Sequence, residues 1–343
     1  MEAIMNQSRP GEFELIHQLT RGLPKYRREV VNGIGDDCAV LKLKGDKYLL
    51  LTCDVQVEGA HFFAKKTMPE IVGQRAVSVN ISDIAAMGGK PTYCLVSLIT
   101  PKKLSTDYIE ALYRGIKSTC VRSDIQIVGG NISSGRQLAI DIFMMGEVRP
   151  GDILTRKGAK PGDKLLVTGS LGGSAAGLEI IKNKIVMRRE DKVSLIEKHL
   201  SPVPRLKESE IIAKSRMATS MIDISDGLAS DVRHICNQSN VGVVINESQL
   251  PIPSGVARVE ELLGLKPMSL ALSGGEDYEL LLTASPDAAE KIIKMVKSKT
   301  GTDVNIIGEI MPPDAGRWIF GVDGQMRPLI ATGWDHLKEN GIE

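Results

Sequence analysis

Aromatic residues, net charge and paired cysteines are all scarce in this 343-residue sequence. Phe, Trp and Tyr together make up 4% of the residues, which argues against aromatic platforms for stacking single-stranded nucleic acid. The formal net charge is only +1, so no field of the whole molecule attracts nucleic acid or an anionic membrane. We therefore expect neither a nucleic-acid partner nor a membrane partner.

The five cysteines are widely scattered, and no two of them are spaced as Cys-x-x-Cys. Their odd number and their separation argue against a disulfide framework or a zinc motif, and they fit reduced thiols in the cytosol. No stretch approaches 18 consecutive apolar residues, and residues 1–10 lack the apolar core of a signal peptide. We therefore expect a soluble, cytoplasmic protein.

Hydrophobic residues make up 42% of the chain, and the length exceeds the size at which a single core usually splits. Helical and strand patterns alternate along the chain, which predicts an α+β or α/β architecture. The segment 149–163 is rich in Pro and Gly and is the best linker in the sequence. We therefore expect two domains, over residues 1–150 and 151–343.

Two adjacent carboxylates, Asp36 and Asp37, lie in the glycine-flanked stretch Gly33-Ile34-Gly35-Asp36-Asp37-Cys38-Ala39. Adjacent carboxylates repel each other unless a cation lies between them, and the glycines allow a ligand to come close. A metal-bound phosphate is one explanation. The other is an acidic surface turn, which the motif favours when it is taken alone because Asp is common in turns.

A third carboxylate, Asp83, falls on a helix predicted between Pro69 and the Gly88-Gly89 stop, over residues 69–87. This helix is apolar nearly all round, which is typical of a buried helix. A carboxylate on it needs a hydrogen-bond partner, a cation or a raised pKa. A metal ion is one solution, and a cap or an arginine partner is the other.

Further carboxylates follow predicted strands in both halves. Asp54 lies late in a strand, and Asp223 and Asp226 flank Ser225 where a strand passes into a helix. We expect one of Ser225 and Asp226 to be the N-cap of that helix. Ligands that are all oxygen suit Mg²⁺ and disfavour zinc or copper. Dispersed Asp residues therefore predict several Mg²⁺ ions around a nucleotide.

The stretch 169–177 joins a predicted strand to a helix and is rich in glycine, but it matches neither Walker A nor G-x-G-x-x-G. We interpret it as tight helix packing rather than phosphate binding. The other expected elements are helices over residues 13–19, 107–120, 192–199, 204–216, 228–237 and 286–299, and strands over residues 39–43, 48–57, 125–128, 139–148, 164–168, 219–224, 241–245, 278–283 and 304–310.

No Ser/His/Asp or Cys/His pattern indicates a catalytic nucleophile. Cys38 and Cys53 lie beside acidic residues, which raise rather than lower the pKa of a thiol. His61 either contacts a phosphate or packs in the core, and the residues alone leave both open.

Spaced motifs run through nearly the whole chain: Gly11-Glu12-Phe13, Gly33-Ile34-Gly35-Asp36-Asp37, Thr52-Cys53-Asp54, Glu58-Gly59-Ala60-His61, Val79-Asn80-Ile81-Ser82-Asp83, Val128-Gly129-Gly130, Arg156-Lys157-Gly158-Ala159-Lys160-Pro161-Gly162-Asp163, Ile222-Asp223-Ile224-Ser225-Asp226-Gly227-Leu228, Leu272-Ser273-Gly274-Gly275-Glu276-Asp277-Tyr278 and Gly333-Trp334-Asp335-His336. With these motifs the sequence resembles the thiamine-monophosphate kinase family, within the superfamily of aminoimidazole-ribonucleotide synthetase-like ATP-binding proteins.

The resemblance implies transfer of the γ-phosphoryl group of ATP to thiamine monophosphate, which gives thiamine diphosphate and ADP. It also implies a homodimer whose amino-terminal domains join their sheets into a β-barrel. By similarity, the Mg²⁺ positions are Asp37, Thr52, Cys53, Asp54, Asp83, Asp223 and Asp226, with the five Asp residues as the catalytic set. The nucleotide positions are Tyr113, Gly130, Asn131, Arg156 and Ser225, and the thiamine-phosphate positions are His61, Glu276 and Trp334.

The predicted site residues suit the reaction that the resemblance implies. Donor and acceptor are both phosphates, so Mg²⁺ ions are needed to offset their repulsion, and an ionised acceptor oxygen needs no general base. Trp334 offers a flat face for the cationic thiamine ring, or else it anchors the carboxy-terminal tail.

The sequence departs from the family pattern at Asn131, where the family usually has Asp. A neutral amide binds a cation more weakly than a carboxylate does, so we expect retained activity with a changed Mg²⁺ requirement. Two alternatives are another ATP-using sibling of the superfamily and a nucleotide-binding homologue with altered catalysis.

Overall fold

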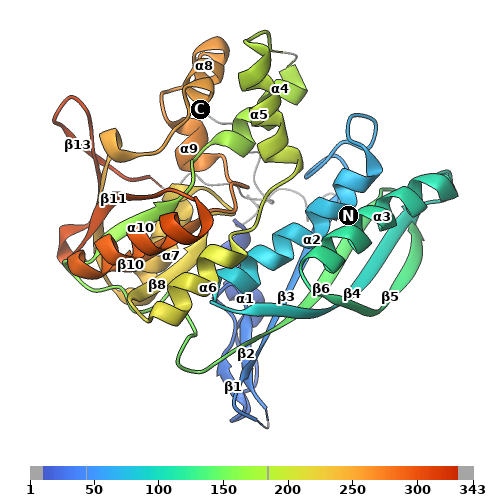
Figure 1. Ribbon diagram of the computed structural model, residues 1–343, viewed down its shortest axis with the longest axis horizontal. Helices are drawn as coiled ribbons and strands as arrows, with labels where there is room; N and C mark the ends of the chain where they lie inside the picture. Colours follow the sequence, from blue (N-terminus) through green and yellow to red (C-terminus); the bar gives the residue numbers. More distant parts are fainter. Residues whose placement is uncertain (1–10, 44, 184, 331–343) are drawn as a thin grey trace, which may run out of the picture.

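The computed structural model describes residues 11–43, 45–183 and 185–330. Trp334, a predicted thiamine-phosphate position, lies outside the described residues. The chain forms two mixed β-sheets, each with its own helices, side by side (Figure 1). Most neighbouring strands in both sheets are antiparallel, so the α+β alternative describes the architecture better than α/β.

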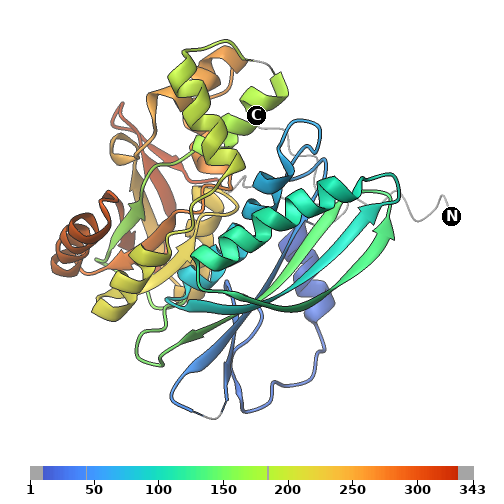
Figure 2. The ribbon, with the colours of Figure 1, turned by 45° about the vertical axis from the view of Figure 1, so that its right-hand side comes forward.

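The first sheet has the strand order β1-β2-β3-β6-β4-β5. Its strands are β1 (Val30–Asn32), β2 (Ala39–Lys42), β3 (Tyr48–Val57), β4 (Lys90–Pro101), β5 (Gln126–Gly135) and β6 (Ala139–Val148), and its helices are α1 (Glu12–Thr20), α2 (Pro69–Ala86) and α3 (Thr106–Arg122). Ser105 caps α3, because its side chain accepts a hydrogen bond from the Tyr108 backbone N–H. Figure 2 shows α3 lying along this sheet.

Helices cover one face of the first sheet, and no described helix covers the apolar side chains that β4 exposes on the other. Along β4, Cys94, Val96 and Leu98 are buried in the core that α2 and α3 share. Tyr93 and Leu95 alternate with them and are each 41% exposed. Successive side chains of a strand point to opposite faces, so the face away from α2 and α3 presents apolar side chains to solvent.

The second sheet has the strand order β13-β12-β9-β11-β7-β10-β8. Its strands are β7 (Lys164–Thr168), β8 (Ala218–Asp223), β9 (Gly242–Asn246), β10 (Leu280–Ala284), β11 (Val304–Met311), β12 (Arg317–Phe320) and β13 (Met326–Pro328). The helices are α4 (Gly173–Asn183), α5 (Arg189–Leu200), α6 (Leu206–Ser215), α7 (Leu228–Ser239), α8 (Ser254–Leu263), α9 (Ser269–Ser273) and α10 (Pro286–Thr300). Helices α6 and α10 share a core with Leu280 and Leu282, whereas α7 shares one with Leu281, so the two groups cover opposite faces.

Helix α2 lies between the two domains and packs against both. It contacts β3, β4, β6 and α3 of its own domain and also α5, α6 and β8 of the second domain. A helix enclosed on all sides must be apolar all round, which confirms the sequence-based prediction that this helix is buried. Two of its polar residues bind the second domain, because Arg75 donates to Glu276 and Ser82 donates to Asp223.

The predicted helices and strands within the described residues are all present, with ends that differ by a few residues. The strand predicted over residues 125–128 is longer and runs to Gly135, so Gly130 and Asn131 lie inside β5 and not at its end. Strand β4 was not predicted, although buried and exposed residues alternate along it, because Pro91 and Pro101 lie near its two ends. Helix α8 was missed as well, because it follows the irregular segment with Pro251 and Pro253. None of the described helices is long and apolar enough to cross a membrane.

Candidate active site

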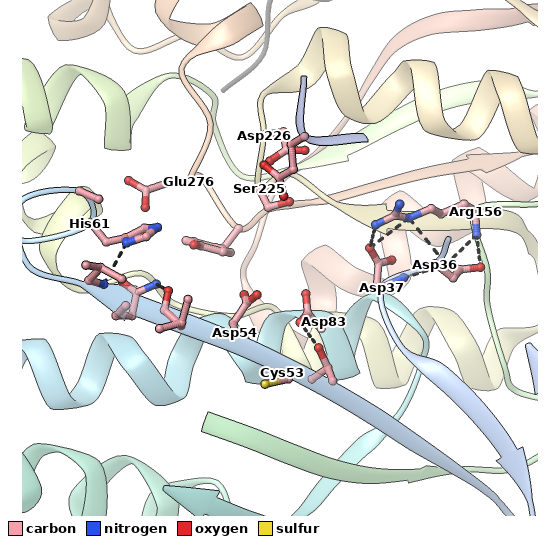
Figure 3. Close-up of a pocket in the computed structure, with 17 residues that line it drawn as sticks. Asp36, Asp37, Cys53, Asp54, His61, Asp83, Arg156, Ser225, Asp226 and Glu276 are labelled. Atoms are coloured by element: carbon pink, nitrogen blue, oxygen red, sulfur yellow. Dashed lines mark hydrogen bonds and ion pairs between the residues drawn. The ribbon is translucent and has the colours of Figure 1, made fainter. Parts of the chain in front are cut away.

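A cavity of about 580 Å³ lies between β3 and α2 of the first domain and two loops of the second (Figure 3). Ten of the predicted site residues line it: Asp37, Thr52, Cys53, Asp54, His61, Asp83, Arg156, Ser225, Asp226 and Glu276. An eleventh, Asp223, lies next to it, because Asp223 accepts a hydrogen bond from Ser82, the neighbour of Asp83 on α2. The fold thus gathers residues that are up to about 240 positions apart in sequence, as expected of a site at a domain boundary.

Asp36 and Asp37 lie at one end of the cavity, and both side chains are 1% exposed. Asp36 accepts hydrogen bonds from Asn32 Nδ2 at 2.9 Å and from the Arg156 backbone N–H at 3.3 Å. Asp37 Oδ1 accepts hydrogen bonds from Arg156 Nη2 at 2.5 Å and Nε at 3.2 Å. The alternative of an acidic surface turn is therefore wrong: the pair is buried, and Asp36 fixes the backbone of the residue that neutralises Asp37.

The middle of the cavity holds Asp54 from β3 and Asp83 from α2 (Figure 3). The Thr52 hydroxyl donates to Asp83 Oδ2 at 2.5 Å, and the Asp54 backbone N–H donates to Asn80 Oδ1 at 3.0 Å. These bonds join β3 to α2 and orient the two carboxylates. Within the described residues no arginine pairs with Asp83, so the alternative of an arginine partner is not what the fold uses.

Ser225 and Asp226 enter the cavity from the turn between β8 and α7. Neither caps the helix: the N-cap is Gly227, whose N–H donates to Asp231 Oδ2 at 3.1 Å. The predicted cap was wrong because α7 begins at Leu228, so Gly227 takes the N-cap position and Ser225 and Asp226 precede it. Ser225 and Asp226 are thereby available to the cavity.

Burial raises the pKa of five Asp residues in this cluster, and the charges of neighbouring carboxylates raise it further in all of them except Asp37; the five are Asp36, Asp37, Asp83, Asp223 and Asp226. Burial, and then the charge of Asp37, raise the pKa of Asp223 to about 8. The pKa of Asp226 rises to about 7, first through burial and then through Glu12, and that of Asp36 rises to about 6 through burial and Asp37. The pKa of Asp83 is raised well above its usual value by burial, Asp54 and Asp223.

The donor set fits a hard divalent cation. Asp37 Oδ2 and Asp223 Oδ1 are buried, and neither has a hydrogen-bond partner within the described residues. Buried carboxylate oxygens without a partner are costly, and a cation satisfies several of them at once. Because these donors are carboxylate oxygens, Mg²⁺ or Mn²⁺ fits them better than zinc does.

The thiols beside the cluster are not nucleophiles. Burial and the surrounding Asp charges raise the pKa of Cys38 well above its usual value, as predicted. The Cys53 thiol donates to Asp141 Oδ1 on β6 at 3.1 Å, and its pKa rises to about 12 through burial and this bond. Both cysteines therefore stay protonated near neutral pH.

His61 and Glu276 lie at the other end of the cavity (Figure 3). The Val57 backbone N–H donates to His61 Nδ1 at 3.0 Å, so a neutral His61 ring must carry its proton on Nε2. Glu276 accepts a hydrogen bond from Arg75, a buried residue of α2. The cavity therefore has an arginine–carboxylate pair at each end and acidic residues between them.

The glycine-rich stretch 169–177 does not open toward the cavity. The N–H groups of Gly172 and Ser174 donate to the two oxygens of Asp277, at 2.7 and 3.2 Å. A carboxylate of the chain thus occupies the place that a phosphate would take in a phosphate loop. This agrees with the interpretation that the stretch serves helix packing.

Three predicted nucleotide positions lie outside this cavity. Tyr113 packs against the core of the first domain from α3, and Gly130 and Asn131 are on β5, three strands from β3 and thus roughly 14 Å away. A Cβ at Gly130 would lie 1.9 Å from the Val96 carbonyl oxygen, so only glycine fits there. Asn131 is exposed, opposite Ser97 on β4.

The structure adds Asp231, His234 and Arg75, which sequence reasoning missed, beside the predicted Asp226 and Glu276. Asp226, Asp231 and His234 bring ligand atoms within 4.8 Å of one another, which is close enough to hold a metal ion. The spacing of Asp231 and His234, one turn apart on a helix, was the available signal. Arg75 gave no comparable signal, because its partners come from distant segments.

Comparisons with known proteins agree with this geometry. Residues 35–148 match the family model of the AIR synthase related protein, N-terminal domain, and residues 160–319 match that of the C-terminal domain. The two halves of the chain are thus an AIR synthase related pair of domains, which defines the class of protein.

The relatives are more specific. Thiamine-monophosphate kinases from Aquifex aeolicus and Escherichia coli K12 are each 36% identical, over 95% of this chain and 98% of their own length. The solved structure of AaThiL complexed with AMPPCP and TMP is 35% identical and superposes with a TM-score of 0.81, over 96% of this chain and 99% of that chain. The chain therefore belongs to the thiamine-monophosphate kinases among the AIR synthase related proteins. The structure of a HypE–HypF complex, at 20% identity and a TM-score of 0.75, shares the fold alone.

Proposed function

We propose that this protein transfers the γ-phosphoryl group of ATP to the phosphate of thiamine monophosphate, in a Mg²⁺-dependent reaction that releases ADP. The observation that carries the proposal is the acidic cluster at the domain boundary, with two buried carboxylate oxygens that have no hydrogen-bond partner among the described residues. A structural neighbour at 35% identity was solved with AMPPCP and TMP, which supports a nucleotide and a thiamine phosphate as ligands.

In this proposal the Mg²⁺ ions are held by Asp37, Asp54, Asp83, Asp223 and Asp226, with Thr52 and Cys53 beside them. Bound Mg²⁺ offsets the repulsion between the two phosphate groups and stabilises charge on the transferred group. The acceptor is already an oxyanion near neutral pH, so no residue has to act as a general base. This explains why a cavity with a single histidine among its lining residues can perform the reaction.

The nucleotide end is assigned to Arg156 and Ser225. Arg156 now neutralises Asp37, and its side chain is 14% exposed at the cavity. A guanidinium makes forked hydrogen bonds to phosphate as well as to carboxylate. We assign Arg156 to the nucleotide phosphates and Asp37 to Mg²⁺. When the ligands bind, the ion pair between Arg156 and Asp37 is therefore replaced by two others, Arg156 with phosphate and Asp37 with Mg²⁺.

The acceptor end is assigned to His61 and Glu276, with Trp334 assigned to the thiamine ring by family resemblance. His61 Nε2–H is a donor suited to the phosphate of the acceptor. The Glu276 carboxylate is a partner suited to the thiamine cation and its amino group.

The direct test is to incubate the protein with Mg²⁺, ATP and thiamine monophosphate, and to measure thiamine diphosphate and ADP. Equal amounts of both products are expected, and chelation of Mg²⁺ by EDTA should stop their formation. ATP hydrolysis without thiamine diphosphate would contradict the proposal. Nucleotide binding without any turnover would instead favour a regulatory homologue, the alternative that Asn131 raises.

We also propose a homodimer, formed by the open faces of the first sheets. Val55, Tyr93, Leu95 and Ile99 are each 41–43% exposed on this sheet. Tyr113, Gly130 and Asn131 lie outside the cavity of their own chain, so we assign them to the cavity of the partner subunit. The five cysteines are all free thiols, which agrees with a reducing compartment, and we place the reaction in the cytoplasm.

The dimer is tested with Leu95→Glu, which places a charge on the proposed interface without touching the cavity. Light scattering should show a dimer for the native protein and a monomer for the variant, with unchanged circular dichroism. Turnover should fall with the loss of the dimer if the partner completes the site. A monomeric native protein with full activity would contradict both parts of this proposal.

A further inference from the structure

Arg75 is a buried arginine of α2 that contacts both domains. Its side chain is 2% exposed, and its donors reach three separate segments. Nε donates to Gln56 Oε1 on β3 at 2.9 Å, Nη1 donates to the backbone carbonyl of His199 on α5, and Nη2 donates to Glu276 Oε1. A buried guanidinium with three directed acceptors is held in one orientation, so it also fixes the groups that it binds.

Glu276 needs to be held, because its loop has an unusual backbone. Glu276 has φ +60° and Tyr278 has φ +50°, in the left-handed region that favours glycine. The Glu276 backbone N–H donates to the Ser225 carbonyl at 2.7 Å, and the Tyr278 N–H donates to the Ile224 carbonyl at 2.8 Å. The loop is therefore hydrogen-bonded to the Ser225 turn. This directs the Glu276 side chain to the cavity, at the cost of two residues with positive φ.

The other neighbour of the carboxylate is a neutral histidine. His199 Nδ1 lies 3.5 Å from Glu276 Oε2 and 3.2 Å from Ser174 Oγ. Burial, and then the nearby Arg75 charge, lower the pKa of His199 to about 4, so it carries no charge near neutral pH. Burial by itself would raise the pKa of Glu276, but Arg75, followed by His199 and His61, lowers it overall. Arg75 thus contributes most to keeping Glu276 ionised.

We propose that Arg75 is a positioning residue for recognition of the phosphoryl acceptor: it holds the Glu276 carboxylate in the cavity beside His61, ready to bind the cationic organic part of the acceptor. This inference rests on the proposed function. Arg75 belongs to the first domain, but its guanidinium binds β3, α5 and the Glu276 loop. These contacts allow it to control the acceptor end of the site. The nucleotide end, with Arg156 and Asp37, is separate from it (Figure 3).

The test measures the dissociation constants of thiamine monophosphate and of Mg²⁺-ATP by calorimetry, for native protein and for Arg75→Met. The variant should bind thiamine monophosphate about tenfold more weakly, as expected from losing a charge-assisted contact, and ATP within about twofold of native. In turnover, the KM for thiamine monophosphate should rise by the same factor while kcat changes little. Arg75→Lys should rescue part of the loss, because it keeps the charge but not the fork.

A double-mutant cycle distinguishes positioning from a general structural role. If Arg75 acts through Glu276, then Arg75→Met combined with Glu276→Gln should bind thiamine monophosphate within about twofold of Glu276→Gln alone. Effects that add would overturn the inference, as would an equal loss of ATP affinity. If Arg75→Met does not fold, the same cycle is carried out with Arg75→Lys.

Arg205→Met is the matched control. Arg205 binds Glu279 through two hydrogen bonds of 2.6 Å, so this variant also breaks an arginine–glutamate pair close to the same loop. It should leave the affinity for thiamine monophosphate unchanged, and a loss equal to that of Arg75→Met would refute the inference. If native protein binds thiamine monophosphate but makes no thiamine diphosphate, the proposed function fails while these binding constants still decide the role of Arg75. If it does not bind thiamine monophosphate, the inference fails too.

Discussion

The two ends of the cavity each contain an arginine paired with a carboxylate, but the two pairs differ in how firmly they are held. Arg156 is 14% exposed and reaches Asp37, whose second oxygen has no hydrogen-bond partner in the described part of the chain. Arg75 is 2% exposed and binds acceptors on three segments, of which Glu276 is one. The Arg156 guanidinium is thus the more exposed of the two and its partner is only partly satisfied, whereas the Arg75 guanidinium is enclosed, although the Glu276 carboxylate that it holds is 20% exposed at the cavity.

This difference indicates different roles for the two arginines. A pair with an unsatisfied oxygen and partial exposure can exchange its partners when a cation and a phosphate arrive. An enclosed guanidinium with several acceptors would leave buried groups unpaired if it moved, so it stays in place. The Arg156 end is thus suited to ligands that come and go with each turnover, and the Arg75 end to a fixed recognition surface.

The largest effect is expected for the acidic cluster between the two ends. Asp223→Asn removes a charge that the proposed Mg²⁺ ions require, so kcat should fall roughly 10³-fold, equivalent to about 4 kcal/mol. Without Mg²⁺ and above pH about 8, where Asp223 is ionised, the same variant should melt at a higher temperature than native protein, because it removes repulsion in a crowded acidic site. Steady-state kinetics and thermal unfolding in EDTA measure the two effects. A variant that loses both activity and stability would indicate a structural role for Asp223.

Arg156→Met should give the opposite kinetic pattern to Arg75→Met. Losing the guanidinium at the proposed nucleotide end should raise the KM for ATP by about tenfold or more and leave the KM for thiamine monophosphate nearly unchanged. Measuring both KM values for both variants under one set of conditions sharpens the comparison. If each arginine variant weakens both substrates equally, the two ends do not have separate roles.

A smaller effect, on stability, follows from the raised pKa values of Asp36, Asp226 and Asp223, at about 6, 7 and 8. Above pH about 4 the unfolded chain has released these protons, whereas the folded chain keeps them until its own pKa values are passed. Without Mg²⁺, stability should therefore fall as pH rises from about 4 to 8.

Mg²⁺ competes with those protons, so the rise in melting temperature that it produces should grow over the same pH window. Thermal unfolding at several pH values, in EDTA and in Mg²⁺, measures both trends. Asp223→Asn provides the control and should flatten the upper part of the pH dependence. A Mg²⁺ effect that does not change with pH would show that these carboxylates are not the ligands.

The fold could be predicted where local patterns are strong. The all-round apolar pattern of α2 correctly indicated a helix buried on every side. Strand β4 was missed. It is an alternating segment with a proline near each end, and such a segment forms a strand only if neighbouring strands pair with it. Its neighbours β5 and β6 come later in the chain.

The site was predictable in its residue types but not in its pairings. Carboxylates after strands indicated a Mg²⁺ site, and the fold brings them together. The contact of Arg156 with Asp37 and that of Arg75 with Glu276 each join residues more than 100 positions apart. No local pattern specifies such a contact, because it depends on how the two domains pack. The helix cap was mistaken because the sequence does not fix where a helix begins to within one or two residues, and α7 begins at Leu228, which leaves Gly227 as the N-cap.

The smallest effect is expected for Asn131→Asp, far from both ends of the cavity of its own chain. Asn131 is exposed on β5, so a carboxylate there carries little desolvation cost and adds one more ligand for a cation in an assembled site. The variant should reach half of its maximal rate at a Mg²⁺ concentration several-fold lower than native protein does, with a similar maximal rate. Rates measured against Mg²⁺ concentration at saturating ATP and thiamine monophosphate test this. Superimposable curves would show that position 131 does not contribute to cation binding, and would also remove the reason for assigning it to the cavity of the partner subunit.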